Sequence, residues 1–213
     1  TELGATASVA AVDVADLNAL EGALESISQP LIGVIHTAGI LDDGVVGEQT
    51  SERLSNVLAP KVDGAWNLHQ LTKDTELDFF VLFSSVASVI GNPGQGNYAA
   101  ANLYLDSLAF MRHAQGLPAV SIAWGTWADS GMAADLGGAD QARMQRRGFY
   151  PLDEAQGLTL LERAVRDEHP GWVAVALDLK RLDRNITQSG LGVPPLYRSL
   201  IRQKSKGIGP SAL

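Results

Sequence analysis

The stretch that decides the fold is residues 79–102, FFVLFSSVASVIGNPGQGNYAAAN, in which a strand, a loop and a helix are expected in succession. The apolar run at residues 79–83 has the length and aromatic content of a buried strand. The glycines and the proline of residues 91–96 mark a loop. A helix is predicted from about residue 97 to 115, and Gly116 closes it because glycine is common just past a helix end.

The same alternation of strands and helices continues on both sides of this stretch. A helix is expected from about residue 51 to 71, with Pro60 as a kink or a restart. Asp153 and Gln156 form a predicted capping pair for a helix that reaches about Arg166. Repeated strand–helix–strand units predict an α/β fold with a Rossmann-like, doubly wound parallel sheet. The further strands are expected at residues 8–12, 31–36, 119–124 and 172–176, and leucines at helical spacing follow the first of them.

One unit of such a fold is missing from the sequence. A dinucleotide-binding sheet normally opens with a strand, a Gly-rich turn and a helix. The sequence contains no GxGxxG, and the glycines of residues 91–96 have a different spacing and lie deep in the chain. We therefore expect a partial sheet without its first βαβ unit. Since the chain also lacks an initiator Met, we expect a piece of a longer protein.

Composition excludes several classes of function. The chain has 213 residues and 46% hydrophobic residues, which suits one α/β domain with a core. A net charge of −8 without a Lys/Arg-rich run argues against nucleic acid or a membrane surface as partner. The absence of cysteine excludes disulfides and thiolate sites and suits a cytoplasmic protein. The 4 histidines have no metal-ligand spacing, so no metal site is predicted, and His36 is expected to be a satisfied core histidine.

Four side chains could act together on a ketone: Ser85, Tyr98, Asn102 and Lys61. Ser85 follows a buried strand, at the sheet edge where ligands bind, and Tyr98 and Asn102 share one helix face. When hydride reaches the ketone carbon, a hydroxyl must hold the oxygen and an acid must protonate it. An ammonium lowers the pKa of a nearby phenol, and an amide can order a replacement water. Taken singly, each of these residues would be a surface or capping residue.

Residues 82–102 resemble the core motif of ketoreductase domains of modular polyketide synthases, in the short-chain dehydrogenase/reductase superfamily. Most members of that superfamily carry Tyr-x-x-x-Lys. Ketoreductases of polyketide and animal fatty acid synthases have asparagine at the last position, here Asn102, and an earlier lysine, here Lys61 within residues 59–68. The resemblance implies that Tyr98 is the proton donor, Ser85 the partner of the ketone oxygen, and Lys61 and Asn102 the supporting pair.

The resemblance extends over about residues 5–200 and implies NADPH as cofactor. It implies a catalytic part at residues 1–200, with a mobile lid at about residues 128–150. The aperiodic tail at residues 201–213 is predicted to be a linker. The cofactor residues that it implies are Asp13 and Val14 near the adenine, Ala38 and Gly39 near the ribose, and Trp124, Gly125 and Thr126 near the nicotinamide. Without the Gly-rich turn, residues 1–213 alone are expected to bind NADPH weakly and not to turn over.

Stereochemistry is implied by a second motif. Residues 41–43, Leu41, Asp42 and Asp43, resemble the fingerprint of B-type ketoreductases, which form a D-configured hydroxyl. A-type enzymes carry tryptophan eight residues before the tyrosine, where this chain has Ile90, and Ala101 is not the proline of the epimerising subclass. Gln95 and Met132 complete the implied substrate-guiding set.

The function implied is reduction of a β-ketoacyl thioester carried on an acyl carrier protein, with the other domains of the same synthase as partners. Two alternatives stay open. One is a non-catalytic scaffold half of a reductase, although such domains usually lose the tyrosine or its companions. The other is a free-standing alcohol dehydrogenase, against which Asn102 and the linker-like tail count.

Overall fold

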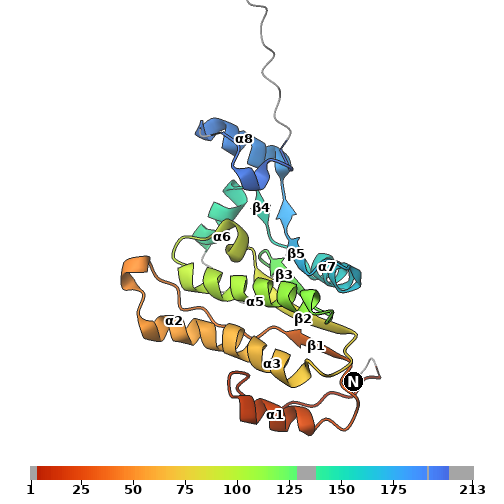
Figure 1. Ribbon diagram of the computed structural model, residues 1–213. Helices are drawn as coiled ribbons and strands as arrows, with labels where there is room; N and C mark the ends of the chain where they lie inside the picture. Colours follow the sequence, from red (N-terminus) through yellow and green to blue (C-terminus); the bar gives the residue numbers. More distant parts are fainter. Residues whose placement is uncertain (1–3, 129–137, 191, 202–213) are drawn as a thin grey trace, which may run out of the picture.

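The computed structural model describes residues 4–128, 138–190 and 192–201. Its centre is a four-stranded parallel sheet in the order β1-β2-β3-β5 (Figure 1). The strands are β1 (Gly33–His36), β2 (Phe79–Ser85), β3 (Val120–Trp124) and β5 (Gly171–Ala174). All three pairings are parallel, so the carboxyl ends of the strands meet at one edge of the sheet. The predicted Rossmann-like parallel sheet is confirmed.

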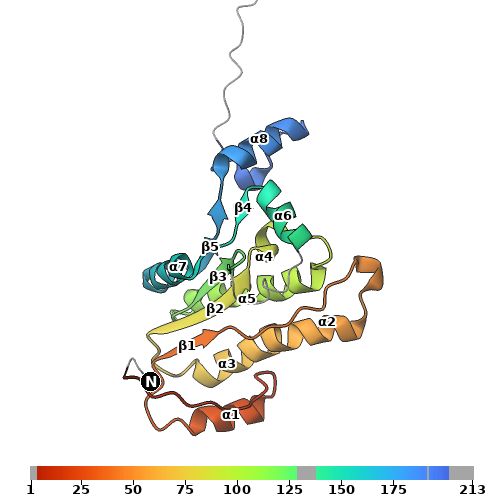
Figure 2. The same cartoon turned by 180° about the vertical axis from the view of Figure 1, so that it is seen from behind.

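Helices cover both faces of this sheet, which explains why β2 reads as a continuous apolar run. Phe80 and Leu82 of β2 point to one face and belong to a core with α1 (Leu17–Glu25), α3 (Gly64–Thr72) and α5 (Gly96–Ala114). Val81 of β2 and Ile122 of β3 point to the other face. They pack in a second core with α7 (Glu154–Arg166), which Figures 1 and 2 show beside β3 and β5.

The stretch predicted as one helix with a kink at Pro60 is three consecutive helical segments. Helix α2 (Ser51–Leu58) passes into a π-helical turn, η2 (Ala59–Asp63), and then into α3. Proline has no N–H to donate within a regular helix, and π-turns are common at functional sites. Lys61 lies inside this turn, which therefore sets the direction of its side chain.

Several local predictions are confirmed. Asp153 accepts from the backbone N of Gln156 at 2.8 Å and donates its own N–H to Gln156 Oε1 at 3.1 Å, the reciprocal capping pair that starts α7. Helix α5 ends next to Gly116, whose φ of 74° is readily adopted by glycine.

Residues 8–12 are not a strand, which corrects the prediction. No described residue pairs with them, and Val9 is 97% exposed. A strand is defined by hydrogen bonds to a neighbour, so a short run with two valines does not form one where no neighbour lies beside it.

A smaller layer stands above the carboxyl edge of the sheet (Figure 1). The sequence did not predict the elements of this layer, which are α4 (Ala87–Ile90), α6 (Gly138–Arg146), the antiparallel pair β4 (Phe149–Tyr150) and β6 (Ala176–Leu177), and α8 (Leu179–Ser189). Nor did it predict two short 3-10 turns, η1 (Val46–Glu48) and η4 (Pro195–Tyr197). Ile201, the first residue of the predicted linker, is buried, and the rest of that linker lies outside the described residues. Within the described ranges, no helix is long and apolar enough to cross a membrane.

Candidate active site

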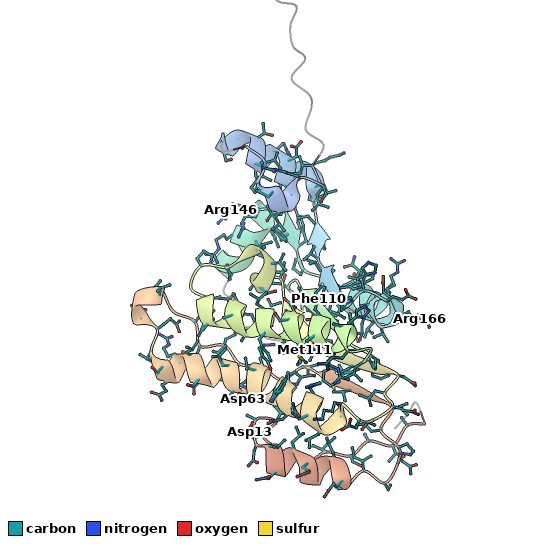
Figure 3. All side chains as sticks on the ribbon, in the orientation of Figure 1. Asp13, Asp63, Phe110, Met111, Arg146 and Arg166 are labelled. Carbon is teal, nitrogen blue, oxygen red and sulfur yellow. The ribbon has the colours of Figure 1, made fainter. Side chains whose placement is uncertain are left out.

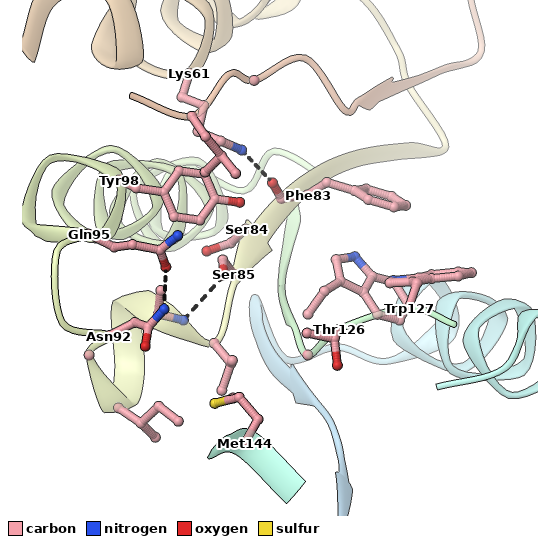
Figure 4. Close-up of a pocket in the computed structure, with 18 of the residues that line it drawn as sticks. Lys61, Phe83, Ser84, Ser85, Asn92, Gln95, Tyr98, Thr126, Trp127 and Met144 are labelled. Atoms are coloured by element: carbon pink, nitrogen blue, oxygen red, sulfur yellow. Dashed lines mark hydrogen bonds between the residues drawn. The ribbon is translucent and has the colours of Figure 1, made fainter. Parts of the chain in front are cut away.

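A cleft of about 450 Å³ opens at the carboxyl ends of β2 and β3. Three of the four predicted catalytic residues line it: Lys61, Ser85 and Tyr98. Figure 4 shows Lys61 and Tyr98 on one side of the cleft, Thr126 and Trp127 across from them, and Met144 of α6 at its outer end. Residues far apart in the sequence are thus brought to the edge of the sheet where open α/β folds bind ligands.

Ser85 is the last residue of β2, and the turn that follows fixes its side chain. The backbone N of Ala87 donates to Ser85 Oγ at 3.2 Å, and the backbone N of Val86 donates to the Trp124 carbonyl oxygen at 2.8 Å. The second bond ties the end of β2 to the end of β3. The Ser85 hydroxyl still has its proton to donate into the cleft.

Tyr98 lies in the first turn of α5 and is only 8% exposed. Its backbone N donates to Asn97 Oδ1 at 2.8 Å, which holds the helix start in place. Burial raises the pKa of the Tyr98 phenol, and the Ser85 and Asn102 side chains lower it by a smaller amount. The sequence predicted that Lys61 would lower the pKa of Tyr98. In this structure that pKa is raised, because the desolvation of the phenolate outweighs its favourable contacts.

Lys61 is a buried cation, with 2% of its surface exposed. Its Nζ donates to the Phe83 carbonyl oxygen at 3.0 Å and lies 5.7 Å from the centre of the Tyr98 ring (Figure 4). Burial lowers the pKa of Lys61 from 10.5 to about 8, against the opposing charge of Asp106. Gly39 leaves room for this side chain, since a Cβ at Gly39 would stand 2.7 Å from Lys61 Cε.

Asn102 lies behind Tyr98, fully buried, and does not line the cleft itself. Its Nδ2 donates to the backbone carbonyl oxygen of Tyr98 at 2.7 Å, and the backbone carbonyl oxygen of Asn102 accepts from Ser84 Oγ at 3.2 Å. These bonds join α5 to β2. Asn102 Oδ1 has no partner among the described residues, so a buried acceptor is available at the back of Tyr98.

The predicted stereocontrol segment, residues 41–43, reaches the cleft through Leu41. Leu41 lines the cleft, whereas Asp42 and Asp43 are not among the described residues that line it. Asp42 Oδ1 pairs with Arg53 Nε at 2.7 Å, and Arg53 also donates to the Asp43 carbonyl oxygen. Asp43 Oδ2 accepts from Gln95 Nε2 at 2.8 Å. Sequence reasoning missed Arg53, because nothing in its local pattern distinguishes it from a solvated helix arginine.

Gln95 continues a chain of side-chain hydrogen bonds across the cleft. Asn92 Nδ2 donates to Gln95 Oε1 at 2.9 Å (Figure 4). Arg143 of α6 in turn donates to Asn92 Oδ1 at 3.1 Å. The segment at residues 41–43 is thereby connected to α6, which lies within the predicted lid. Met132, predicted to guide the substrate, lies outside the described residues.

The predicted cofactor residues fall into two groups. Gly39, Trp124, Gly125 and Thr126 line the cleft, and Ala38 is half-buried next to Gly39. Trp124 also packs against Trp127, with ring centres 5.0 Å apart, so it serves the core as well.

The second group, Asp13 and Val14, lies apart from the cleft, before the start of α1. Asp13 is exposed there, and its Oδ1 accepts from the backbone N of Ala15 at 2.9 Å (Figure 3). Asn67 Nδ2 donates to the Val14 carbonyl oxygen at 3.1 Å, which fixes this segment against α3.

His36, at the carboxyl end of β1, is buried next to this site. Burial and the charge of Lys61 lower the pKa of His36 to about 4, so the ring is neutral at physiological pH. Its Nε2 has no partner among the described residues, so the prediction of a fully satisfied core histidine is wrong for that nitrogen. The described residues contain no cluster of three or more His, Asp or Glu side chains that could hold a metal ion.

Comparisons with known proteins agree on one class. The sequence profile of the KR domain family matches residues 1–129. Polyketide synthase GfsB of Streptomyces halstedii is 51% identical over 204 residues, which cover 94% of this chain and 4% of that synthase. The phenolphthiocerol synthesis polyketide synthase type I Pks15/1 of Mycobacterium marinum is 48% identical over 207 residues, covering 95% of this chain and 10% of that protein.

Solved structures give the same result. The PlmKR1 ketoreductase from the first module of phoslactomycin biosynthesis in Streptomyces sp. HK803 superimposes with a TM-score of 0.83 at 37% identity, covering 95% of this chain and 46% of that chain. An A-type ketoreductase from a modular polyketide synthase has a TM-score of 0.81 at 38% identity, covering 86% of this chain and 39% of that chain.

The fold and the cleft thus define a reductase of the short-chain dehydrogenase/reductase type. The chain belongs to the KR domain family, the ketoreductase domains of modular polyketide synthases. It spans only 4% and 10% of the two synthases named above, and less than half of either solved ketoreductase.

Proposed function

We propose that this domain reduces the β-ketone of an acyl thioester, held on an acyl carrier protein, to a D-configured alcohol with NADPH as the hydride source. The observation that carries the proposal is the convergence of Ser85, Tyr98 and Lys61 on one cleft. A hydroxyl donor, a protonated phenol and a cation are the groups that ketone reduction requires. Membership of the KR domain family supports the same reaction, and the other domains of a synthase are its proposed partners.

The roles of the four residues follow from their surroundings. Because the pKa of Tyr98 is raised, its phenol is protonated at neutral pH and can give a proton to the ketone oxygen. Ser85 donates a second hydrogen bond to that oxygen while negative charge builds on it. Lys61, with a pKa of about 8, is mostly an ammonium at pH 7 and stabilises the phenolate that Tyr98 becomes. The unpaired Oδ1 of Asn102 suits a water that returns the proton.

The residues present fit the nicotinamide and ribose half of NADPH. A cleft of about 450 Å³ is large enough for such a group. When bound, the cofactor supplies a hydride to the ketone carbon. Gly39, Trp124, Gly125 and Thr126 are the proposed contacts inside the cleft, with Ala38 beside them and with Asp13 and Val14 toward the adenine. Since the sequence lacks GxGxxG, we propose that residues 1–213 alone bind NADPH weakly.

The proposed D-configuration depends on the wall made by Leu41 and Gln95. Asp42 and Asp43 act indirectly, because Arg53 and Gln95 hold their carboxylates. The wall occupies one side of the cleft, so the acyl arm is expected to enter from the other side and to present one ketone face to the hydride. The position of tryptophan in A-type enzymes is taken here by Ile90, which lines the cleft without filling it as an indole would.

The test is a reduction assay with the complete ketoreductase domain that contains this chain. A simple β-ketoacyl thioester and NADPH should give the β-hydroxyacyl product, and chiral chromatography should show mainly the D-configured alcohol. The absence of thioester-dependent NADPH oxidation would refute the reaction and favour a non-catalytic scaffold. A mainly L-configured product would refute only the stereochemical part.

A further inference from the structure

Asp106 lies on the face of α5 that carries Tyr98 and Asn102. It follows Asn102 by four residues, as Asn102 follows Tyr98, so the three side chains form one row along the helix. This row faces the sheet, with Asn102 bonded to Ser84 near the carboxyl end of β2 and Asp106 bonded to Ser121 near the amino end of β3. The first two members of the row are already assigned to ketone reduction, whereas Asp106 does not line the cleft.

The Asp106 carboxylate joins three elements. Its Oδ1 accepts from Ser121 Oγ of β3 at 2.6 Å, and its Oδ2 accepts from Ser88 Oγ of α4 at 2.7 Å. Both distances are those of charge-assisted hydrogen bonds from a hydroxyl to a carboxylate. Ser121 is buried in the sheet, so the carboxylate has a fixed place between helix and sheet.

The same carboxylate is connected to two of the proposed catalytic residues. Ser88 Oγ also lies 2.8 Å from the Ser85 carbonyl oxygen, so its single proton is shared between that oxygen and Asp106, and Ser88 lies between the carboxylate and the peptide that carries Ser85. The negative charge of Asp106 also raises the pKa of Lys61, against the burial that lowers it. One group thus influences the position of Ser85 and the charge of Lys61.

We propose that Asp106 is a positioning residue of the reductase site, fixing the turn that carries Ser85 through Ser88 and stabilising the buried Lys61 ammonium by its charge. The inference rests on the proposed function, because it presupposes that Ser85 and Lys61 act on a ketone.

The groups that face Lys61 support this assignment. From β1 comes His36, which is neutral near pH 7 because its pKa is about 4. From α5 comes Tyr98, whose phenol is also neutral because its pKa is raised, and further along the same helix lies Asp106, whose charge acts on Lys61 through space. From β2 comes only a carbonyl oxygen, that of Phe83. Among the described groups around Lys61, Asp106 supplies the negative charge that favours the ammonium.

The test is the pH dependence of kcat/KM for β-ketoacyl thioester reduction by the complete ketoreductase domain. Reduction needs Lys61 protonated, so activity falls as pH rises through the Lys61 pKa of about 8. Asp106→Asn keeps the size and one acceptor oxygen but removes the charge, and it should move this alkaline limb to lower pH by about one unit. Ser121→Ala removes a hydrogen bond but keeps the charge, so its limb should stay in place. Asp74→Asn, an exposed site at the end of α3, controls for net charge.

The position of Ser85 is tested separately by Ser88→Ala. This variant should lower kcat about tenfold with KM and the alkaline limb unchanged, since it removes the hydroxyl between Asp106 and the Ser85 peptide but keeps the Asp106 charge and its bond to Ser121. A folded Asp106→Asn whose limb coincides with that of the wild type would overturn the charge role. If Asp106→Asn does not fold, Asp106→Glu takes its place. That variant keeps the charge, so its alkaline limb should coincide with that of the wild type while kcat falls, and a displaced limb would overturn the charge role. Wild-type protein without activity would refute the proposed function itself, and this inference with it.

Discussion

Lys61→Met should make the domain more stable while abolishing ketone reduction. Methionine has nearly the length of lysine and carries no charge, so it fits the 2% exposed site beside Gly39 and the Tyr98 ring. A catalytic cation that is buried without a contacting carboxylate lowers stability for the sake of function, and its removal restores that stability.

The magnitude follows from the pKa of Lys61. Burial lowers it from 10.5 to about 8. Each pKa unit corresponds to about 1.4 kcal/mol, so keeping the ammonium buried costs about 3 kcal/mol. Methionine leaves the Phe83 carbonyl oxygen without its donor, which costs about 1–2 kcal/mol. The net gain in the free energy of unfolding is therefore about 1–2 kcal/mol, which corresponds to a rise in Tm of about 1–2 °C for the complete domain, because the shift per kcal/mol falls as the chain lengthens.

The pH dependence gives the prediction its sign. Below pH 8 the amine is protonated in the folded and the unfolded chain alike, so the wild type carries the full penalty. Between about pH 8 and pH 10.5 the Lys61 amine is protonated in the unfolded chain but largely neutral in the folded one, so the wild type gains stability as the pH rises. The advantage of Lys61→Met should thus be largest at pH 7 and shrink toward pH 10.

Thermal unfolding of the complete domain at several pH values measures this difference. Lys73→Met is the matched control, because Lys73 is exposed at the end of α3 and its loss should change stability by less than about 0.5 kcal/mol. A Lys61→Met variant that is less stable than the wild type at pH 7 would show that the ammonium is a net stabiliser, and the reasoning would be wrong.

Three further predictions concern the cleft. Gly39→Ala should lower turnover about tenfold with little loss of Tm, because the new Cβ would stand only 2.7 Å from Lys61 Cε and would push that side chain aside. Wild-type turnover, in kinetic assays paired with thermal melts, would contradict this. Gln95→Leu should give a product of lower stereochemical purity on chiral chromatography, since it breaks the hydrogen bond to Asp43. An unchanged ratio of the two alcohols would count against the wall of Leu41 and Gln95 as the source of stereocontrol. Calorimetric titration of residues 1–213 with NADPH should give millimolar or weaker affinity, whereas micromolar affinity would mean that the Gly-rich turn is dispensable.

The sequence predicted most of the sheet and one side of the site. The apolar runs at residues 79–83 and 119–124 became buried parallel strands, because both faces of this sheet are covered by helices. The spacing of Tyr98 and Asn102 placed both on one face of α5, since helical periodicity is a local property.

What the sequence could not predict depends on contacts between distant segments. Residues 8–12 carry a strand-like pattern but have no described neighbour, and pairing is not encoded within five residues. Arg53 and Asp106 have no local signature, since their roles arise from partners ten or more residues away. The raised pKa of Tyr98 likewise reflects burial by the assembled fold.

The most direct test of the central claim is the turnover of Tyr98→Phe in the complete ketoreductase domain, measured as thioester-dependent NADPH oxidation. We expect a loss of at least about 100-fold, because the variant lacks the proton donor while packing is kept. Tyr104→Phe is the matched control and should keep wild-type turnover, because Tyr104 lies six residues further along the same helix and does not line the cleft. Tyr98→Phe turnover within a few-fold of the wild type would contradict the assignment of this cleft as the active site.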